Sequence, residues 1–173
     1  MPLPPIYDPE AVKPMWQELA AVGVDPLTTP EQVDEVLKDE PGTVLVIVNS
    51  VCGCAAGSAR PGAMLALQHP TIPDRSVTVF AGVDRDAVER ARAHMAGYPP
   101  SSPSMGLFKG GRLVFVLQRT DLQQMQAEQV AAALQGAFDA HCSRTGPSVD
   151  AETFRKIRPF EGCGSQIPAF GQS

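Results

Sequence analysis

The chain has 173 residues, 43% of them hydrophobic, which is enough for one domain with an ordinary buried core. Its formal net charge of −5 and its lack of any Lys/Arg cluster argue against nucleic acid as a partner. No segment approaches the roughly 20 consecutive apolar residues that span a bilayer, so we expect no membrane partner.

The N-terminal segment predicts where the protein works. Residues 1–9 are Pro-rich and lack both the basic start and the apolar run of a signal peptide, which predicts a cytoplasmic protein. In the cytoplasm thiols are kept reduced, and two cysteines close together are more often catalytic or metal-binding than structural. The chain has four cysteines, of which only the first two are neighbours in sequence: Cys52, Cys54, Cys142 and Cys163.

Two helices are predicted ahead of a buried strand. The first covers residues 10–22, and Pro14 delays the start of its regular part. The second begins at Thr29, which provides an N-cap, and Gln32 three residues later completes the capping pattern. A continuous β-branched run then covers residues 43–48. Because this run has no polar alternation, it predicts a strand buried on both faces, typical of a central parallel strand.

Helices and strands alternate through the rest of the domain. A helix over residues 55–68, kinked or restarted at Pro61-Gly62, follows the first cysteine pair. Asp84 is expected to cap a later helix, and Gly110-Gly111 between two apolar runs indicates an antiparallel hairpin. The other predicted elements are a strand over 76–81, a helix over 86–95, strands over 104–109 and 112–118, and a helix over 126–141.

This order of elements predicts an α/β fold. A β-α-β start followed by an antiparallel hairpin and a last helix gives one mixed β-sheet flanked by helices, with the first three strands near its centre. Residues 1–142 form this domain. Residues 143–173 are rich in Gly and Pro and predict an irregular C-terminal tail, with a turn of helix near Ala151–Lys156.

The Cys52-Gly53-Cys54 motif lies between the end of the buried strand and the start of a helix, where sites gather in open α/β sheets. Unpaired N–H groups and the helix dipole favour a thiolate, so we expect the pKa of Cys52 to lie below its ordinary value of about 8.5. No Lys, Arg or His lies within seven residues of Cys52, so the helix end is expected to provide most of this stabilisation. Arg60 lies one or two turns further along, and Cys54 is expected to be the more buried thiol.

Gly53 permits a tight turn between the two thiols. A disulfide across a single residue closes a small ring, and strain makes such a bond easier to reduce, so the motif suits reversible thiol–disulfide exchange. Pro103 is a further candidate because it precedes a strand expected beside the first one. From its residues alone it is a turn proline, whereas a cis bond there would offer backbone groups to an incoming chain.

Two other interpretations of the cysteine pair stay open. The thiols could simply be packed, since free cysteine is often buried. A zinc site usually needs four Cys or His ligands with a second close pair. The remaining candidate ligands are His69, His94, His141, Cys142 and Cys163. They are scattered along the chain without the spacing of a second ligand pair, so we expect no metal and no bound cofactor.

The segment after Pro103, Ser-Met-Gly-Leu-Phe-Lys-Gly-Gly, resembles thioredoxins, which place a Pro before Thr-Leu-Leu/Met-Phe-Lys-x-Gly. Several blocks together resemble the bacilliredoxin family more closely. The Cys-Gly-Cys motif alone is a weak signal, whereas the blocks together are highly specific. They are Val48–Gly57, Ala59–Pro61, Val77–Gly82, Ser101–Met105 and Ala137–Cys142.

This resemblance implies a thioredoxin-like fold and an oxidoreductase that removes bacillithiol, a low-molecular-weight thiol, from S-bacillithiolated proteins. It implies that Cys52 is the attacking thiol, Cys54 a resolving thiol and Pro103 a cis proline. Bacillithiol is then a co-substrate, and a reductase that the sequence does not identify regenerates the site. The 31 residues after Cys142, with their own Cys163, depart from the family pattern.

Two alternatives give the same motif a different role. A general disulfide reductase or isomerase would use both thiols on other substrates. A metal-binding or redox-sensing module would use them without turnover. The metal content of the reduced protein separates the second alternative from the enzymes, and the masses of adducts with different mixed disulfides separate the two enzymes.

Overall fold

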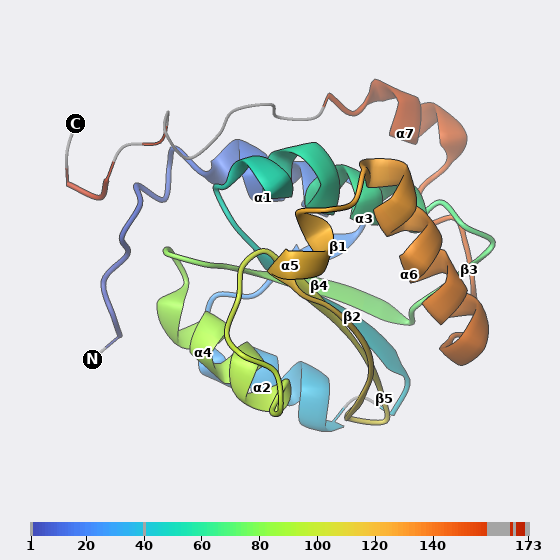
Figure 1. Cartoon of the computed structure of the whole chain (residues 1–173), viewed down its shortest axis with the longest axis horizontal. Coiled ribbons are helices and arrows are strands. Elements are labelled where there is room, and N and C mark those ends of the chain that lie inside the picture. Colours follow the sequence, from blue (N-terminus) through green and yellow to red (C-terminus); the bar gives the residue numbers. More distant parts are fainter. Residues whose placement is uncertain (1, 40, 159–166, 168, 172–173) are drawn as a thin grey trace.

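A five-stranded mixed sheet forms the middle of the computed structural model, which describes residues 2–39, 41–158, 167 and 169–171 (Figure 1). Its strands are β1 (Val24–Pro26), β2 (Thr43–Asn49), β4 (Arg75–Phe80), β5 (Ser104–Lys109) and β6 (Arg112–Leu117). They lie side by side in the order β1-β4-β2-β5-β6. The three central strands are those expected at the centre, so the prediction of one mixed sheet is confirmed.

β2 is buried along its whole length, as its continuous apolar run predicts. It pairs in parallel with β4 and antiparallel with β5. Leu45 packs into the core cluster on one face of the sheet, whereas Val44 and Val46 pack into the cluster on the other face. Successive side chains of a strand point to opposite faces, so β2 requires a covering layer on each side.

Helices provide these two layers (Figure 1). One face carries α2 (Pro30–Asp39) and α4 (Arg85–His94), and the other carries α1 (Lys13–Ala20), α3 (Arg60–Ala66) and α6 (Ala127–His141). All five helices were predicted from the sequence, with ends that differ by a few residues. Among the described residues, no helix is both long and apolar enough to cross a membrane.

Four short elements were not predicted. They are β1, α5 (Arg119–Leu122), and the strands β3 (Thr71–Ile72) and β7 (Arg144–Thr145), which pair with each other as a second small sheet. Elements of two to four residues are too short to show a hydrophobic period, so the sequence pattern could not indicate them.

The described part of the segment after residue 142 agrees with the predicted irregular tail and contains two short elements. β7 lies within it, and α7 (Ala151–Lys156) forms at the predicted turn of helix. Phe154 and Ile157 pack against the main core cluster, so part of this segment lies on the domain rather than apart from it. The division of the chain at residue 142 stays a prediction.

The helix after the cysteine pair restarts next to Pro61, as predicted. A wide turn, η1 (Ala55–Ala59), precedes α3, and the Arg60 N–H bonds to the Ala55 carbonyl five residues back. Pro61 has no N–H to continue the regular ladder, so the turn immediately before it widens.

The two predicted helix caps differ in outcome. The Gln32 N–H donates to Thr29 Oγ1 and the Thr29 N–H donates to Gln32 Oε1, each at 3.2 Å, which confirms the capping box. Asp84 occupies the N-cap position of α4, but its side chain makes no capping hydrogen bond. Burial instead raises the pKa of the Asp84 carboxyl to about 6.

α3 and α6 pack closely at Gly62, which yields a stability prediction. A Cβ at Gly62 would lie 2.5 Å from Val130 Cβ and 2.9 Å from the Ala127 carbonyl oxygen. Overpacking of this kind costs about 1–3 kcal/mol, which exceeds the gain of about 1 kcal/mol in helix propensity from Gly to Ala. We expect Gly62→Ala to lower the free energy of unfolding measured in urea.

Gly136 in α6 provides the matched control, because a Cβ there meets no atom within 4 Å. Gly136→Ala should therefore raise the free energy of unfolding by about 0.5–1 kcal/mol through helix propensity alone. Equal stabilisation by both substitutions would contradict close packing of α3 on α6.

Candidate active site

Cys52 and Cys54 follow the C-terminal end of β2 and begin a helix, as predicted. The N–H groups of Ala55 and Ala56 bond to the Cys52 carbonyl oxygen at 3.1 and 3.3 Å, so the helical ladder starts at Cys52. The two Sγ atoms lie 2.9 Å apart, and the Cys52 N–H donates to Ser50 Oγ at 3.2 Å. The motif is therefore a compact pair of free thiols at the start of a helix.

The pKa values of the two thiols move in opposite directions. Burial alone would raise the pKa of Cys52, but hydrogen bonds from the Cys54 thiol, the Ala55 N–H and the Ser50 side chain outweigh it and lower this pKa. Burial, and then the hydrogen bond and negative charge of Cys52, raise the pKa of Cys54 to about 11. Cys52 is thus the more acidic of the two thiols, and the raised pKa of Cys54 favours Cys54 as the donor in the hydrogen bond between them.

Exposure does not distinguish the two thiols, contrary to the expectation that Cys54 is the more buried. Both have intermediate exposure. The difference in pKa arises from hydrogen bonds to Cys52, first from the Cys54 thiol and then from the Ala55 N–H and the Ser50 side chain, which favour the negative charge of Cys52. Hydrogen bonding, rather than depth, makes Cys52 the more acidic thiol.

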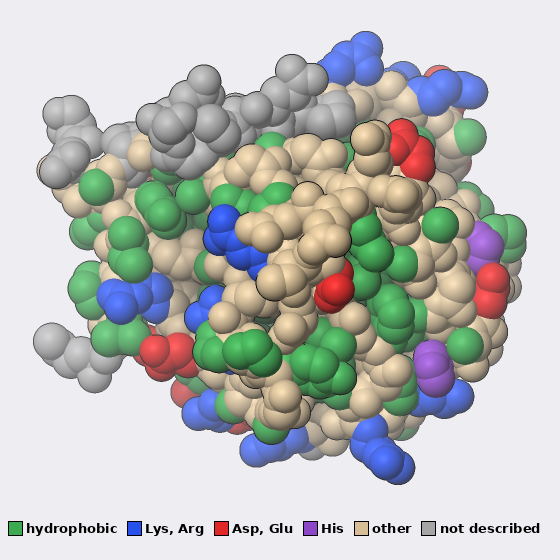
Figure 2. Space-filling model, in the orientation of Figure 1, with side chains coloured by type: hydrophobic (Ala, Val, Ile, Leu, Met, Phe, Trp, Pro, Cys, Tyr) green, Lys and Arg blue, Asp and Glu red, His purple; other side chains and the backbone are tan. Residues whose placement is uncertain are grey.

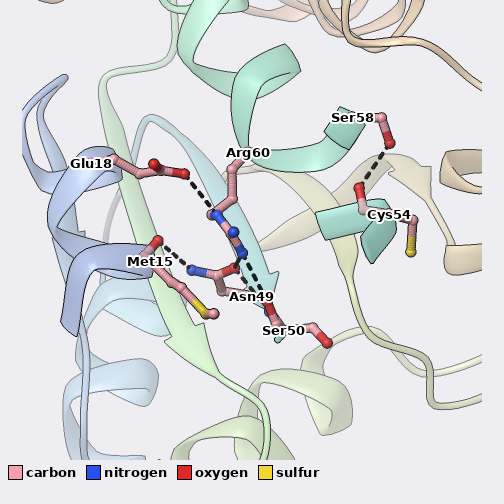
Figure 3. A network of polar contacts seen from close by, with 7 residues as sticks. All are labelled: Met15, Glu18, Asn49, Ser50, Cys54, Ser58 and Arg60. Atoms are coloured by element: carbon pink, nitrogen blue, oxygen red, sulfur yellow. Dashed lines mark hydrogen bonds and ion pairs between the residues drawn. The ribbon is translucent and has the colours of Figure 1, made fainter. Parts of the chain in front are cut away.

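A buried arginine lies behind the motif, reaching from α3 toward the end of β2 (Figure 3). Arg60 is 0% exposed. Its Nε pairs with Glu18 Oε1 at 2.7 Å, and its Nη1 donates to the Ser50 carbonyl at 2.8 Å and to Asn49 Oδ1 at 3.1 Å. Asn49 in turn donates from Nδ2 to the Met15 carbonyl at 3.0 Å. This network ties α1, α3 and the end of β2 together.

The network holds the segment that presents Cys52. Arg60 fixes the Ser50 carbonyl, Asn49 Oδ1 accepts from the Ser50 N–H at 2.8 Å, and the Ser50 hydroxyl accepts from the Cys52 N–H. The guanidinium also interacts electrostatically with Cys52. The sequence placed Arg60 one or two turns after the motif but indicated the helix end as the main source of stabilisation, whereas the structure holds Arg60 against Ser50 and in electrostatic contact with Cys52. An arginine within an apolar helix, two turns after the motif, was the available signal.

Pro103 directly precedes β5, the strand that pairs with β2 on its antiparallel side. The Ser102–Pro103 peptide bond is cis, as predicted. Arg119 Nη1 donates to the Ser102 carbonyl at 3.3 Å, and its charge partly offsets the raised pKa of Cys54. Contact between Pro103 and the cysteine turn stays a prediction.

The other candidate ligands lie elsewhere or outside the described residues. Cys142 forms a hydrogen bond with the Thr43 side chain at the start of β2. At about 3.3 Å per residue, the start of β2 lies roughly 20 Å from the end of β2 that leads to Cys52. His69 pairs with Asp139 and His94 with Asp34, and Cys163 lies outside the described residues. No group of three or more His, Cys, Asp or Glu in the described part of the chain could hold a metal ion.

The order of the two thiol pKa values yields a pH prediction. Alkylation of Cys52 by iodoacetamide should rise with pH as the thiol becomes thiolate, with its midpoint below that of a free cysteine, about 8.5. Cys142, whose pKa burial raises, is an internal control and should react more slowly at neutral pH. Peptide masses report each site; faster alkylation of Cys54 than of Cys52 would contradict the assignment.

Comparisons with known proteins agree with this geometry. A family model described as disulphide isomerase matches residues 7–142. A bacilliredoxin of Koribacter versatilis is 46% identical over 140 residues, covering 81% of this chain and 97% of the relative. One of Halalkalibacterium halodurans is 50% identical over 134 residues, covering 78% and 92%. One of Salinibacter ruber is 45% identical over 172 residues, covering 96% and 98%.

Two solved structures are also similar at low sequence identity. A putative oxidoreductase with a thioredoxin fold is 16% identical, with a TM-score of 0.47, covering 64% of this chain and 93% of that one. Oxidised thioredoxin O2 from Arabidopsis thaliana is 11% identical, with a TM-score of 0.45, covering 68% and 96%.

A mixed sheet flanked by helices presents two hydrogen-bonded thiols of different acidity at a helix start, and the family model and the relatives identify the protein as a thiol–disulfide oxidoreductase. With the family model and these relatives, the chain belongs to the bacilliredoxin family. The relative from Salinibacter ruber spans 96% of the chain, so an extension beyond residue 142 also occurs in another bacilliredoxin.

Proposed function

We propose that the protein removes bacillithiol from S-bacillithiolated protein cysteines through Cys52. The Cys52 thiolate attacks the bacillithiol sulfur, and a new disulfide forms between them. The bond from bacillithiol to the target cysteine breaks, and the target sulfur leaves with the electron pair and takes up a proton. The observation that carries this proposal is the lowered pKa of Cys52, which has the protonated Cys54 2.9 Å away.

Cys54 completes the cycle in this proposal. Its thiolate attacks the Cys52 sulfur, forms the Cys52–Cys54 disulfide and releases bacillithiol. Two of the three causes that raise the pKa of Cys54 come from the Cys52 thiolate. Both disappear once Cys52 is in a mixed disulfide, so Cys54 becomes easier to deprotonate at the step that needs it. Free bacillithiol provides an alternative exit by attacking the same adduct.

The remaining parts of the proposal concern the surroundings of this chemistry. Gly53 permits the tight turn, and Pro103, at the start of β5, docks the backbone of the target protein. No cofactor is bound; bacillithiol is the co-substrate. The partners are S-bacillithiolated cytoplasmic proteins and a reductase, not yet identified, that reduces the Cys52–Cys54 disulfide.

A model protein with one S-bacillithiolated cysteine tests the proposal. Incubation with the reduced protein should release the free target cysteine, and intact mass should show bacillithiol transiently on Cys52. An S-cysteinylated copy of the same target is the matched substrate and should react more slowly. Release no faster than by an equal concentration of dithiothreitol would refute the proposed activity.

A general disulfide isomerase is the second candidate, favoured by the description of the family model that matches residues 7–142. It predicts that the protein restores activity to a scrambled disulfide protein at least as fast as it clears the bacillithiolated target. Comparing both assays at one enzyme concentration decides between the two activities.

A further inference from the structure

The cleft beside Cys52 carries an inference that rests on the proposed function. We infer that it binds a carboxylate of the small thiol that is transferred to Cys52. The cleft has a volume of about 350 Å³. Six of the residues that line it are relevant to ligand binding: Tyr7, Ser50, Arg85, Glu89, Arg92 and Ser102.

The position of the cleft connects it to the nucleophile. Ser50 lines it, and the Ser50 hydroxyl accepts the hydrogen bond of the Cys52 N–H at 3.2 Å. Ser102, next to Pro103, lines it as well. A small thiol attached to Cys52 therefore has a cavity next to it, between the end of β2 and the start of β5.

The charges of the cleft come from one face of α4. Arg85, Glu89 and Arg92 are spaced by four and three residues, which places them on the same side of the helix. Two guanidiniums and one carboxylate leave one net positive charge in the cleft, whereas the whole chain carries −5. In Figure 2, several Lys and Arg side chains lie on the left half of the view, near the N-terminal segment and α4, and others are spread along its bottom, right and top edges.

Arg92 points most directly to an anionic ligand. Its Nε is buried and has no hydrogen-bond partner among the described residues. A buried donor without an acceptor costs about 1–3 kcal/mol, so a ligand oxygen that accepts from it gains a strong, charge-assisted bond. Arginine suits carboxylates in particular, because its planar guanidinium matches the two carboxylate oxygens.

The far wall of the cleft is held in place. Arg85 Nη1 donates to the Pro4 carbonyl at 3.0 Å, and the Ile6 N–H donates to the Gly82 carbonyl at 2.7 Å. These bonds hold the N-terminal segment, with Tyr7, against the start of α4. The cleft is therefore built from three parts of the chain rather than from one loop.

Three mixed disulfides of one peptide test this inference, with mercaptosuccinate, 3-mercaptopropionate or 2-mercaptoethanol as the small thiol. They carry two, one and no carboxylates. The kcat/KM for release of the peptide thiol is divided by the rate constant of dithiothreitol with the same disulfide, which removes differences in intrinsic reactivity. We expect a preference of about tenfold for mercaptosuccinate over 2-mercaptoethanol, the size of one charge-assisted hydrogen bond.

Substitutions locate the preference. Arg92→Gln should reduce the mercaptosuccinate-to-mercaptoethanol ratio to about 1–2, and Arg92→Lys should retain part of it, because only the charge remains. Arg90→Gln is the matched control, since Arg90 lies on α4 but pairs with Asp34 and does not line the cleft. Its ratio should equal that of the wild type. High salt should reduce the wild-type ratio, as screening weakens a charge interaction.

A thiol-free anion gives a second measurement. Succinate should inhibit cleavage of the mercaptosuccinate disulfide competitively in the wild type and lose this effect in Arg92→Gln. Equal wild-type rates on all three disulfides, or no cleavage of any of them, would overturn the cleft assignment. Slow removal of bacillithiol with a retained preference for carboxylates would instead refute the proposed function and leave the cleft assignment standing.

Discussion

Cys52→Ser is expected to abolish removal of bacillithiol from a bacillithiolated target. Serine keeps the shape of the side chain, but its hydroxyl is not ionised at neutral pH and does not attack disulfide sulfur. Cys54 does not replace the lost nucleophile, because burial still raises its pKa. We expect the rate to fall to that of the buffer control, a loss of at least about 100-fold.

Cys54→Ser is the matched variant and should behave differently. The Cys52 thiolate still attacks, so the target cysteine is released at a rate within about tenfold of the wild type. The Cys52–bacillithiol adduct should then accumulate, because the internal exit through Cys54 is gone. Intact mass spectrometry over time follows both variants. Full activity of Cys52→Ser together with loss in Cys54→Ser would reverse the assignment of the two thiols.

Arg60→Met is expected to have the largest effect on stability. It removes the guanidinium from Glu18, Asn49 and the Ser50 carbonyl in a site with 0% exposure. Breaking a buried ion pair by removing one partner costs about 3–5 kcal/mol, and we expect this loss in the free energy of unfolding measured in urea. Arg90→Met, at the partly exposed pair with Asp34, is the matched control and should cost less than about 1 kcal/mol.

The same residue is expected to position Cys52. Arg60→Lys retains the charge but not the two-sided contact with Glu18 and Ser50, and it is the variant to use if Arg60→Met does not fold. In either variant the midpoint of Cys52 alkylation should move to higher pH, because the electrostatic interaction and the anchor of Ser50 are weakened. A loss of stability with an unchanged alkylation midpoint would show that Arg60 supports the fold alone.

Adding Glu18→Gln to Arg60→Met tests whether the cost arises from charge. If the buried carboxylate is the main penalty, the double variant should recover part of the stability that Arg60→Met loses. Strictly additive losses would instead indicate that packing around Arg60 dominates.

Features that depend on local patterns could be predicted from the sequence alone. The unbroken apolar run at residues 43–48 indicated a buried central strand, because a strand that alternates has one face in water. Gly110-Gly111 indicated the hairpin of β5 and β6, since both glycines have positive φ in the turn. The position of Cys52-Gly53-Cys54 between that strand and a helix then placed the thiols at a helix start.

The surroundings of the thiols depend on how distant segments pack and could not be predicted from the sequence. Glu18 and Arg60 are 42 residues apart in sequence, and their pairing depends on how α1 and α3 pack across the end of β2. The turn before Pro61 widens, and Arg60 is buried behind Cys52 rather than in solvent. Likewise, Ser50, Arg92 and Ser102 meet in one cleft because β2, α4 and β5 are neighbours in space. Periodicity reports which face of an element is buried, whereas the partners of a polar group depend on the packing of distant segments.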